Sequence, residues 1–207
     1  MKVKYKSKVE NTIAKANSMV GEHIVYKLGA GGRNPDNLSP ATFKDGVLAC
    51  DCSGFVAWCW GFDRYQDNHV GKNQWDGKSN ARPGLFGYFP YYGGWINTDS
   101  MLEDAFDSNI DWFSHLNYPI PGCIVAYGST GEDNNKRIGH EGLVISTPEY
   151  FDKNNKEHWK KLVIIDCRSA KPAIAIRDGL TWFGNDRAGR PKQSQFCWPN
   201  FVMRNEK

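Results

Sequence analysis

The sequence predicts an α+β domain with an antiparallel sheet, because helical patterns come first and strand patterns follow. Apolar residues recur at helical spacing near the amino terminus, and short apolar runs bounded by turn residues occupy the second half. With 207 residues, of which 40% are hydrophobic, the chain can bury a sizeable core. We therefore expect a single domain over residues 1–207.

Composition and charge exclude several classes of protein. Charged residues make up 24% of the chain, an ordinary share that excludes a wholly disordered protein. No apolar run approaches the roughly 18 residues of a membrane span, and the opening MKVKYKSKVENTIAK lacks the apolar stretch of a signal peptide. A net charge of +3 is too small to indicate nucleic acid as a partner. We expect synthesis in the cytoplasm without a signal peptide and no membrane insertion.

Two helices are predicted in the first third of the chain. Residues 5–20 place apolar side chains on one helical face, and residues 23–29 form a short extended segment. The glycine-rich residues 29–46 predict a loop, and the absence of a following GK[ST] excludes a phosphate loop. Residues 52–61, CSGFVAWCWG, predict a buried helix whose first turn begins near Cys52.

The middle of the chain, residues 62–117, predicts irregular structure apart from a short helix over 101–109. It contains GLFGYFPYYGGW, a cluster of aromatic residues with glycine and proline. Such rings either pack in a core or line a groove for a sugar or peptide. We expect an aromatic-rich insertion over about 62–117 that reshapes a binding cleft.

Strand patterns occupy the second half of the chain and would pair into the antiparallel sheet. The predicted strands are Cys123–Tyr127, Glu141–Ser146, Leu162–Cys167, Ala173–Arg177 and Phe201–Arg204. The polar residues 148–161 between two of them predict an excursion or a short helix. Helices packed on this sheet complete the predicted fold.

The cysteine pattern favours thiols over disulfides or a metal site. Six cysteines lie in a chain that is not a small exported scaffold. The closest pair, Cys50 and Cys52, does not form a CxxC motif, and no HxxxH accompanies it. We expect no metal and no cofactor.

The strongest local signal is Asp51-Cys52-Ser53-Gly54 at the start of the predicted buried helix. A thiol at a helix amino terminus feels the positive end of the helix dipole and unpaired N–H groups, which favour the nucleophilic thiolate. The small residues Ser53 and Gly54 leave room for a substrate. The alternative role, a cysteine that only packs, is expected for Cys59, Cys167 and Cys197.

A thiolate nucleophile needs a base, usually histidine, and a group that orients the histidine. Among five histidines, His140 stands where a loop enters an apolar strand. The next predicted strand ends with Asp166, which could accept the imidazole N–H and fix its tautomer if the two strands pair. The alternative is that Asp166 caps a turn or pairs with Arg168 or Arg177.

These motifs together resemble the NlpC-type family of papain-like cysteine peptidases, which cut bacterial peptidoglycan. The resemblance covers roughly residues 9–60 and 118–170 and rests on Tyr26 with Gly29, Gly31 and Gly32, on DCSGF at 51–55, on Pro121-Gly122, and on Gly139-His140 with Gly142. It implies a papain-like NlpC-type fold, with Cys52 as nucleophile, His140 as base and Asp166 as the third residue.

The resemblance also assigns roles around the nucleophile. It places Tyr26 where it shapes the oxyanion region or binds substrate, and Asp51 and Ser53 where they line the substrate side. Two departures stand out: the third residue is often histidine in the family and is Asp166 here, and Cys123 replaces the usual aspartate after Pro-Gly.

The implied function is hydrolysis of peptidoglycan stem peptides, by resemblance at the bond between γ-D-glutamate and a diamino acid. The chain is then a phage lysin or a secreted antibacterial effector that acts on the cell wall or periplasm after lysis or secretion. A toxin would also need an immunity protein that plugs its cleft.

Two alternatives stay open. The same Cys–His site could serve an N-acetylmuramoyl-L-alanine amidase, as in the related CHAP amidases, or another amide hydrolase or acyltransferase. From a different class, the chain could be a catalytically dead wall-binding module.

Overall fold

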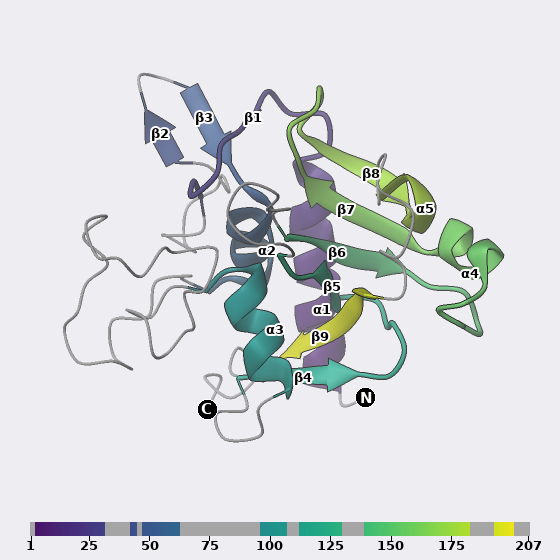
Figure 1. Ribbon diagram of the computed structural model, residues 1–207. Coiled ribbons are helices and arrows are strands. Elements are labelled where there is room, and N and C mark those ends of the chain that lie inside the picture. Colours follow the sequence, from purple (N-terminus) through teal and green to yellow (C-terminus); the bar gives the residue numbers. More distant parts are fainter. Residues whose placement is uncertain are drawn as a thin grey trace.

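The computed structural model describes residues 3–31, 42–44, 47–62, 96–106, 112–129, 139–182 and 193–200. Within these ranges the chain forms helices on a central sheet, together with a smaller second sheet (Figure 1). The α+β class and the antiparallel sheet predicted from the sequence are confirmed.

The central sheet has six strands, and every neighbouring pair is antiparallel. In spatial order the strands are β4 (Phe113–Leu116), β9 (Gln195–Pro199), β5 (Ile124–Tyr127), β6 (His140–Ser146), β7 (Val163–Cys167) and β8 (Ile174–Asp178). The pairing of β6 with β7 places Gly142 opposite Asp166. This register decides which side chains meet at one end of the sheet.

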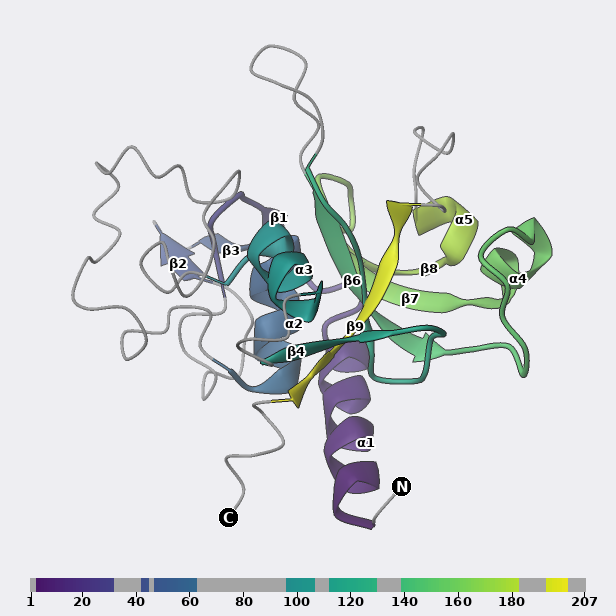
Figure 2. The same cartoon turned by 60° about the horizontal axis from the view of Figure 1, so that its bottom comes forward.

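Helices cover both faces of the sheet (Figure 2). One face carries α1 (Val3–Ser18), α2 (Cys52–Trp60) and α3 (Thr98–Phe106), and the other carries α4 (Lys156–Lys161) and α5 (Gly179–Trp182). Strand residues alternate between the faces, so Leu143 and Ile165 pack toward α2, whereas Val144 and Ile164 pack toward α5. The fold therefore has two apolar cores, one on each side of the sheet.

A small sheet brings the chain to the start of α2. It contains β1 (Val25–Tyr26), β2 (Thr42–Lys44) and β3 (Val47–Cys50) in the order β1-β3-β2. β1 runs parallel to β3, and the register places Tyr26 opposite Cys50. Because Cys50 lies two residues before Cys52, this pairing holds Tyr26 beside the first turn of α2.

The long periodic and apolar segments are predicted well. The helix expected over 5–20 is α1, and the buried helix expected from Cys52 is α2, in which all nine residues are buried. The strands expected at 123–127, 141–146, 162–167 and 173–177 correspond to β5, β6, β7 and β8. The polar stretch 148–161 ends in the short helix α4.

Other expectations are wrong for the described residues. The predicted loop over 29–46 contains β2, and the predicted irregular stretch over 62–117 contains β4. The helix expected from residue 101 begins earlier, at Thr98, because the Asn97 side chain caps it: its Oδ1 accepts the N–H groups of Asp99 and Ser100.

Two further expectations fall on residues that the structure does not describe. The strand predicted over 201–204 lies outside the described residues, and β9, which ends at Pro199, is not among the predicted strands. The aromatic cluster at 84–95 also lies outside them. The end of the predicted insertion, however, belongs to the main fold, since α3 packs beside the central sheet and β4 is its edge strand.

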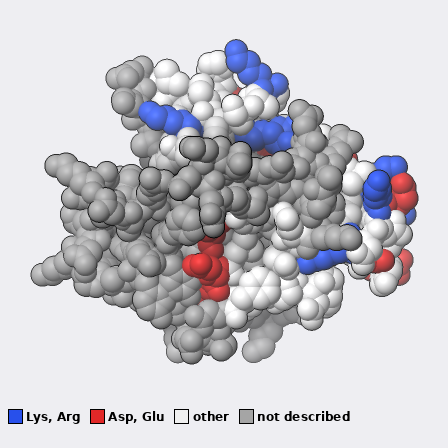
Figure 3. All heavy atoms as spheres, viewed as in Figure 1, with Lys and Arg blue, Asp and Glu red and all other residues white. Residues whose placement is uncertain are grey.

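Surface charge is mixed on the face that Figure 3 shows. Acidic atoms lie near the centre of the view, where Figure 1 shows α3, and the visible basic groups stand apart from one another. In α3, partial burial, followed by the charge of Asp99, raises the pKa of Glu103.

None of the described helices is both long and apolar enough to cross a membrane.

Candidate active site

The first turn of α2 is fixed by the buried carboxylate of Asp51. Its Oδ1 accepts the backbone N–H of Gly54 at 2.7 Å, which caps the helix, and its Oδ2 accepts the N–H of Gly29 at 2.7 Å. Asp51 is only 1% exposed. One side chain thus joins the glycine-rich turn to the start of the helix.

Glycine is required on both sides of this junction. A Cβ at Gly54 would lie 2.3 Å from the carbonyl oxygen of Ala30 and 2.9 Å from the carbonyl carbon of Gly31. In the turn itself, Gly29 and Gly31 have φ angles of 80° and 84°, which other residues rarely adopt. The glycine-rich turn and the DCSG motif are therefore two halves of one packed structure.

Cys52 is the first residue of α2, and its thiol lies beside Tyr26, which also has Cys167 near it. Burial is the main cause that raises the pKa of Tyr26 above its ordinary value, followed by the negative charges of Cys52 and Asp51. A side-chain hydrogen bond between Tyr26 and Cys52 adds to this effect. The phenol therefore keeps its proton and can donate to the thiol sulfur, which stabilises a thiolate.

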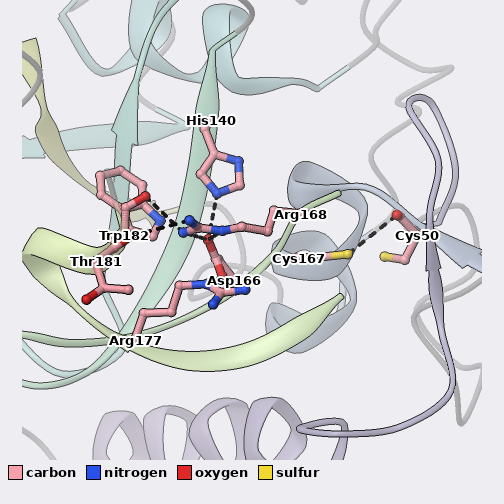
Figure 4. Close-up of polar contacts among 8 residues, drawn as sticks. All are labelled: Cys50, His140, Asp166, Cys167, Arg168, Arg177, Thr181 and Trp182. Atoms are coloured by element: carbon pink, nitrogen blue, oxygen red, sulfur yellow. Dashed lines mark hydrogen bonds and ion pairs between the residues drawn. The ribbon is translucent and has the colours of Figure 1, made fainter. Parts of the chain in front are cut away.

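His140 and Asp166 form a direct hydrogen bond (Figure 4). The Nε2 atom of His140 lies 2.7 Å from Oδ2 of Asp166, and Asp166 is fully buried. The contact follows from the strand register: His140 lies two residues before Gly142, which faces Asp166, so both side chains project from the same face of the sheet. The ring also stacks on Trp182, with centroids 5.6 Å apart.

Asp166 remains ionised in spite of its burial. Burial alone would raise its pKa, but the hydrogen bond and charge of His140 and the charge and hydrogen bonds of Arg168 outweigh it and lower the pKa below the usual value. Arg177 Nε also donates to Oδ1, at 2.8 Å. His140 thus faces a carboxylate, which can only accept a hydrogen bond.

The start of β6, where His140 lies, is held by a hydroxyl. Ser129 Oγ accepts the N–H of Gly139 at 3.0 Å and donates to Asp99 Oδ2 at 2.8 Å, and the Ser129 N–H donates to Asp99 Oδ1 at 2.7 Å. A Cβ at Gly139 would lie 2.8 Å from the carbonyl oxygen of Tyr127. The first turn of α3 is therefore connected to the backbone directly before His140.

The six predicted site residues fall into two neighbouring clusters. Tyr26, Asp51, Cys52 and Ser53 surround the start of α2, and His140 with Asp166 lies at one end of the central sheet. The Cys167 thiol, next to Asp166, contacts the carbonyl oxygen of Cys50 at 3.4 Å. Both clusters therefore lie at the same end of β7.

The structure also shows what Asp51, Ser53 and Asp166 contact. Asp51 and Ser53 are buried and contact each other, with Ser53 Oγ 3.3 Å from Asp51 Oδ1, so Asp51 holds the backbone in place. Asp166 makes both kinds of contact expected from the sequence, because its two oxygens bind His140 and both arginines at once.

Sequence reasoning missed three residues near His140. Trp182 lies in no sequence motif, whereas the Asn97-Thr98-Asp99-Ser100 run is a helix-start signal that points to Asp99. For Ser129, the partner of Asp99, no sequence signal was available. All six cysteines are buried thiols, and within the described ranges no three His, Cys, Asp or Glu side chains group to hold a metal ion.

Comparison with known protein families, with curated proteins and with solved structures finds no match to this chain.

Proposed function

We propose that this chain is a cysteine hydrolase of peptidoglycan stem peptides with a papain-like NlpC-type fold. The observation that carries the proposal is the 2.7 Å hydrogen bond between His140 and the buried Asp166, at the end of the sheet where α2 presents Cys52. A thiol at a helix start, an imidazole and an orienting carboxylate are the parts of a thiol-hydrolase site.

In the proposed reaction the Cys52 thiol gives its proton to Nδ1 of His140, and the sulfur attacks the scissile amide carbonyl. Nδ1 is the available nitrogen because Nε2 faces Asp166. The backbone N–H of Cys52, with the protonated hydroxyl of Tyr26, stabilises the oxyanion. His140 then protonates the leaving amine as the C–N bond breaks, and water hydrolyses the thioester to regenerate the thiol.

The two clusters lie at the same end of β7, on opposite faces of the central sheet. α2 packs on the face opposite His140, so the proposed reaction requires the thiol to reach the ring around the ends of β6 and β7. Hydrogen bonds between nucleophile and base are often long in unliganded enzymes and shorten when substrate binds. The substrate amide would occupy this end of the sheet.

The preferred bond joins γ-D-glutamate to a diamino acid, a choice that rests on the motif resemblance. The setting is a phage lysin or a secreted antibacterial effector acting on the wall or periplasm, and a toxin would be neutralised by an immunity protein. An amidase or acyltransferase using the same residues is the second candidate, because the described site would activate the thiol for either amide. A dead wall-binding module is the outcome if the thiol is inert.

Digestion of purified sacculi tests the proposal. Wild-type protein is expected to release fragments whose masses identify the bond, and Cys52→Ala is expected to release none. Cys59→Ala is the matched control, because Cys59 is buried near the other end of α2. If wild-type protein releases no fragments although Cys52 reacts selectively with iodoacetamide, the sacculus is not the substrate. Without selective alkylation, the chain is no thiol hydrolase.

A further inference from the structure

Two arginines converge on the carboxylate that orients His140 (Figure 4). Arg168 donates to Oδ2 of Asp166 through Nε at 2.9 Å and also through Nη2. Arg177 donates to Oδ1 through Nε at 2.8 Å. Both carboxylate oxygens are therefore held, one of them together with His140.

The strand register explains why these side chains meet. Asp166 lies opposite Ala175 of β8, and Arg177 follows two residues later on the same face. Arg168 lies two residues after Asp166 and so projects to that face as well. This face is the one that α5 covers, and the arginine side chains are only 21% and 15% exposed.

Arg168 also connects the carboxylate to α5. Its Nη2 donates to the carbonyl oxygen of Trp182 at 2.8 Å, and its Nη1 donates to that of Thr181 at 3.4 Å. Trp182 stacks on the His140 ring with an interplanar angle of 29°. The Arg168 guanidinium thus holds both Asp166, which binds the His140 ring, and Trp182, which stacks on that ring.

The charges favour a single protonation pattern. Two guanidinium groups face one carboxylate, and their combined charge exceeds that of Asp166. This surplus opposes protonation of Asp166, so the carboxylate stays an acceptor. An imidazole that faces a fixed acceptor keeps its proton on Nε2 and its lone pair on Nδ1.

We propose that Arg168 and Arg177 are positioning residues that hold Asp166 so that His140 presents Nδ1 as the base, a role that rests on the function proposed above. They act through Asp166 and do not touch the reacting atoms. Each arginine holds a different carboxylate oxygen: Arg177 binds Oδ1, and Arg168 binds Oδ2 and also the Trp182 carbonyl of α5.

The test is nitrogen NMR of the full chain labelled with ¹⁵N in histidine, without substrate. The signals of His140 are identified from their loss in His140→Gln. Wild-type protein is expected to show one tautomer with the proton on Nε2. Arg168→Met and Arg177→Met are expected to shift the His140 nitrogens toward averaged tautomers, whereas Lys171→Met, which removes an exposed charge, is expected to match wild type.

Activity on sacculi supplies a second readout. Each Arg→Met variant is expected to lose kcat on the order of tenfold with little change in KM, and each Arg→Lys variant is expected to recover part of the loss because it keeps the charge. If the methionine variants do not fold, the double variant R168K/R177K takes their place, with an intermediate tautomer shift expected.

Unchanged tautomer signals and kcat in the folded variants would overturn the positioning role. The NMR readout needs no substrate, so it separates this role from the proposed function. Sacculi that stay intact while the tautomer depends on the arginines would refute the peptidoglycan reaction alone. Digestion of sacculi by variants whose His140 tautomer does not depend on the arginines would refute the positioning role alone.

Discussion

Removal of the Asp51 carboxylate is expected to destabilise the protein by about 3 kcal/mol. Loss of a helix cap costs about 1 kcal/mol, and the bond to the N–H of Gly29 adds about 2 kcal/mol, because a charged acceptor makes a stronger hydrogen bond than a neutral one. For a chain of this size, Asp51→Ala should lower the melting temperature by roughly 6–12 °C.

Urea unfolding followed by circular dichroism measures this loss. Asp51→Asn keeps one acceptor oxygen for one of the two N–H groups and should lose about half as much, roughly 1–2 kcal/mol. Asp178→Ala is the control, since the half-buried Asp178 accepts the N–H groups of Leu180 and Thr181 at 2.9 Å but joins only residues of one short turn. It should cost less than about 1 kcal/mol. Equal losses for Asp51→Ala and Asp178→Ala would refute the reasoning.

Three further predictions concern the site. Gly54→Ala should destabilise the protein by about 1–3 kcal/mol in thermal unfolding, because its Cβ would lie 2.3 Å from the Ala30 oxygen. Tyr26→Phe should slow iodoacetamide alkylation of Cys52 several-fold with an unchanged circular dichroism spectrum, since the hydroxyl bond is lost; an unchanged rate would contradict this. Because the folded pKa of Asp166 lies below the unfolded value, its contribution is complete above about pH 4 and is lost as the pH falls through the folded pKa. Urea midpoints between pH 7 and pH 2 should therefore fall with acid more steeply in wild type than in Asp166→Asn, and parallel curves would exclude this linkage.

Prediction from the sequence works best where one chain segment decides its own structure. The apolar run after Asp51 ends at Gly61, whose φ of 72° and backbone bonds to Ala57 and Trp58 close the helix, and every part of that signal is local. The pairing of His140 with Asp166 was also accessible, because consecutive antiparallel strands usually lie side by side.

The rest depends on contacts between distant segments. β9 lies between β4 and β5 in the sheet. Its sequence, Gln195–Pro199, ends in proline, a residue that weakens the strand signal because an inner strand tolerates proline only at its end. The convergence of Arg168 and Arg177 on one carboxylate needs the β7–β8 register, which is not visible in spacing alone. Only the three-dimensional structure shows that Asp166 binds three partners, His140, Arg168 and Arg177.

The hydroxyl of Ser129 has a practical consequence for protein engineering. The chain leaves β5 after Tyr127 and returns to β6 at His140, and both ends of this excursion are already tied together by the Ser129–Gly139 bond and the Tyr127–His140 strand pair. Lengthening a loop whose ends are fixed costs only chain entropy, about 0.6 kcal/mol for each doubling. A reporter peptide inserted at a sequence position between Ser129 and Gly139 should thus leave the β5–β6 register unchanged.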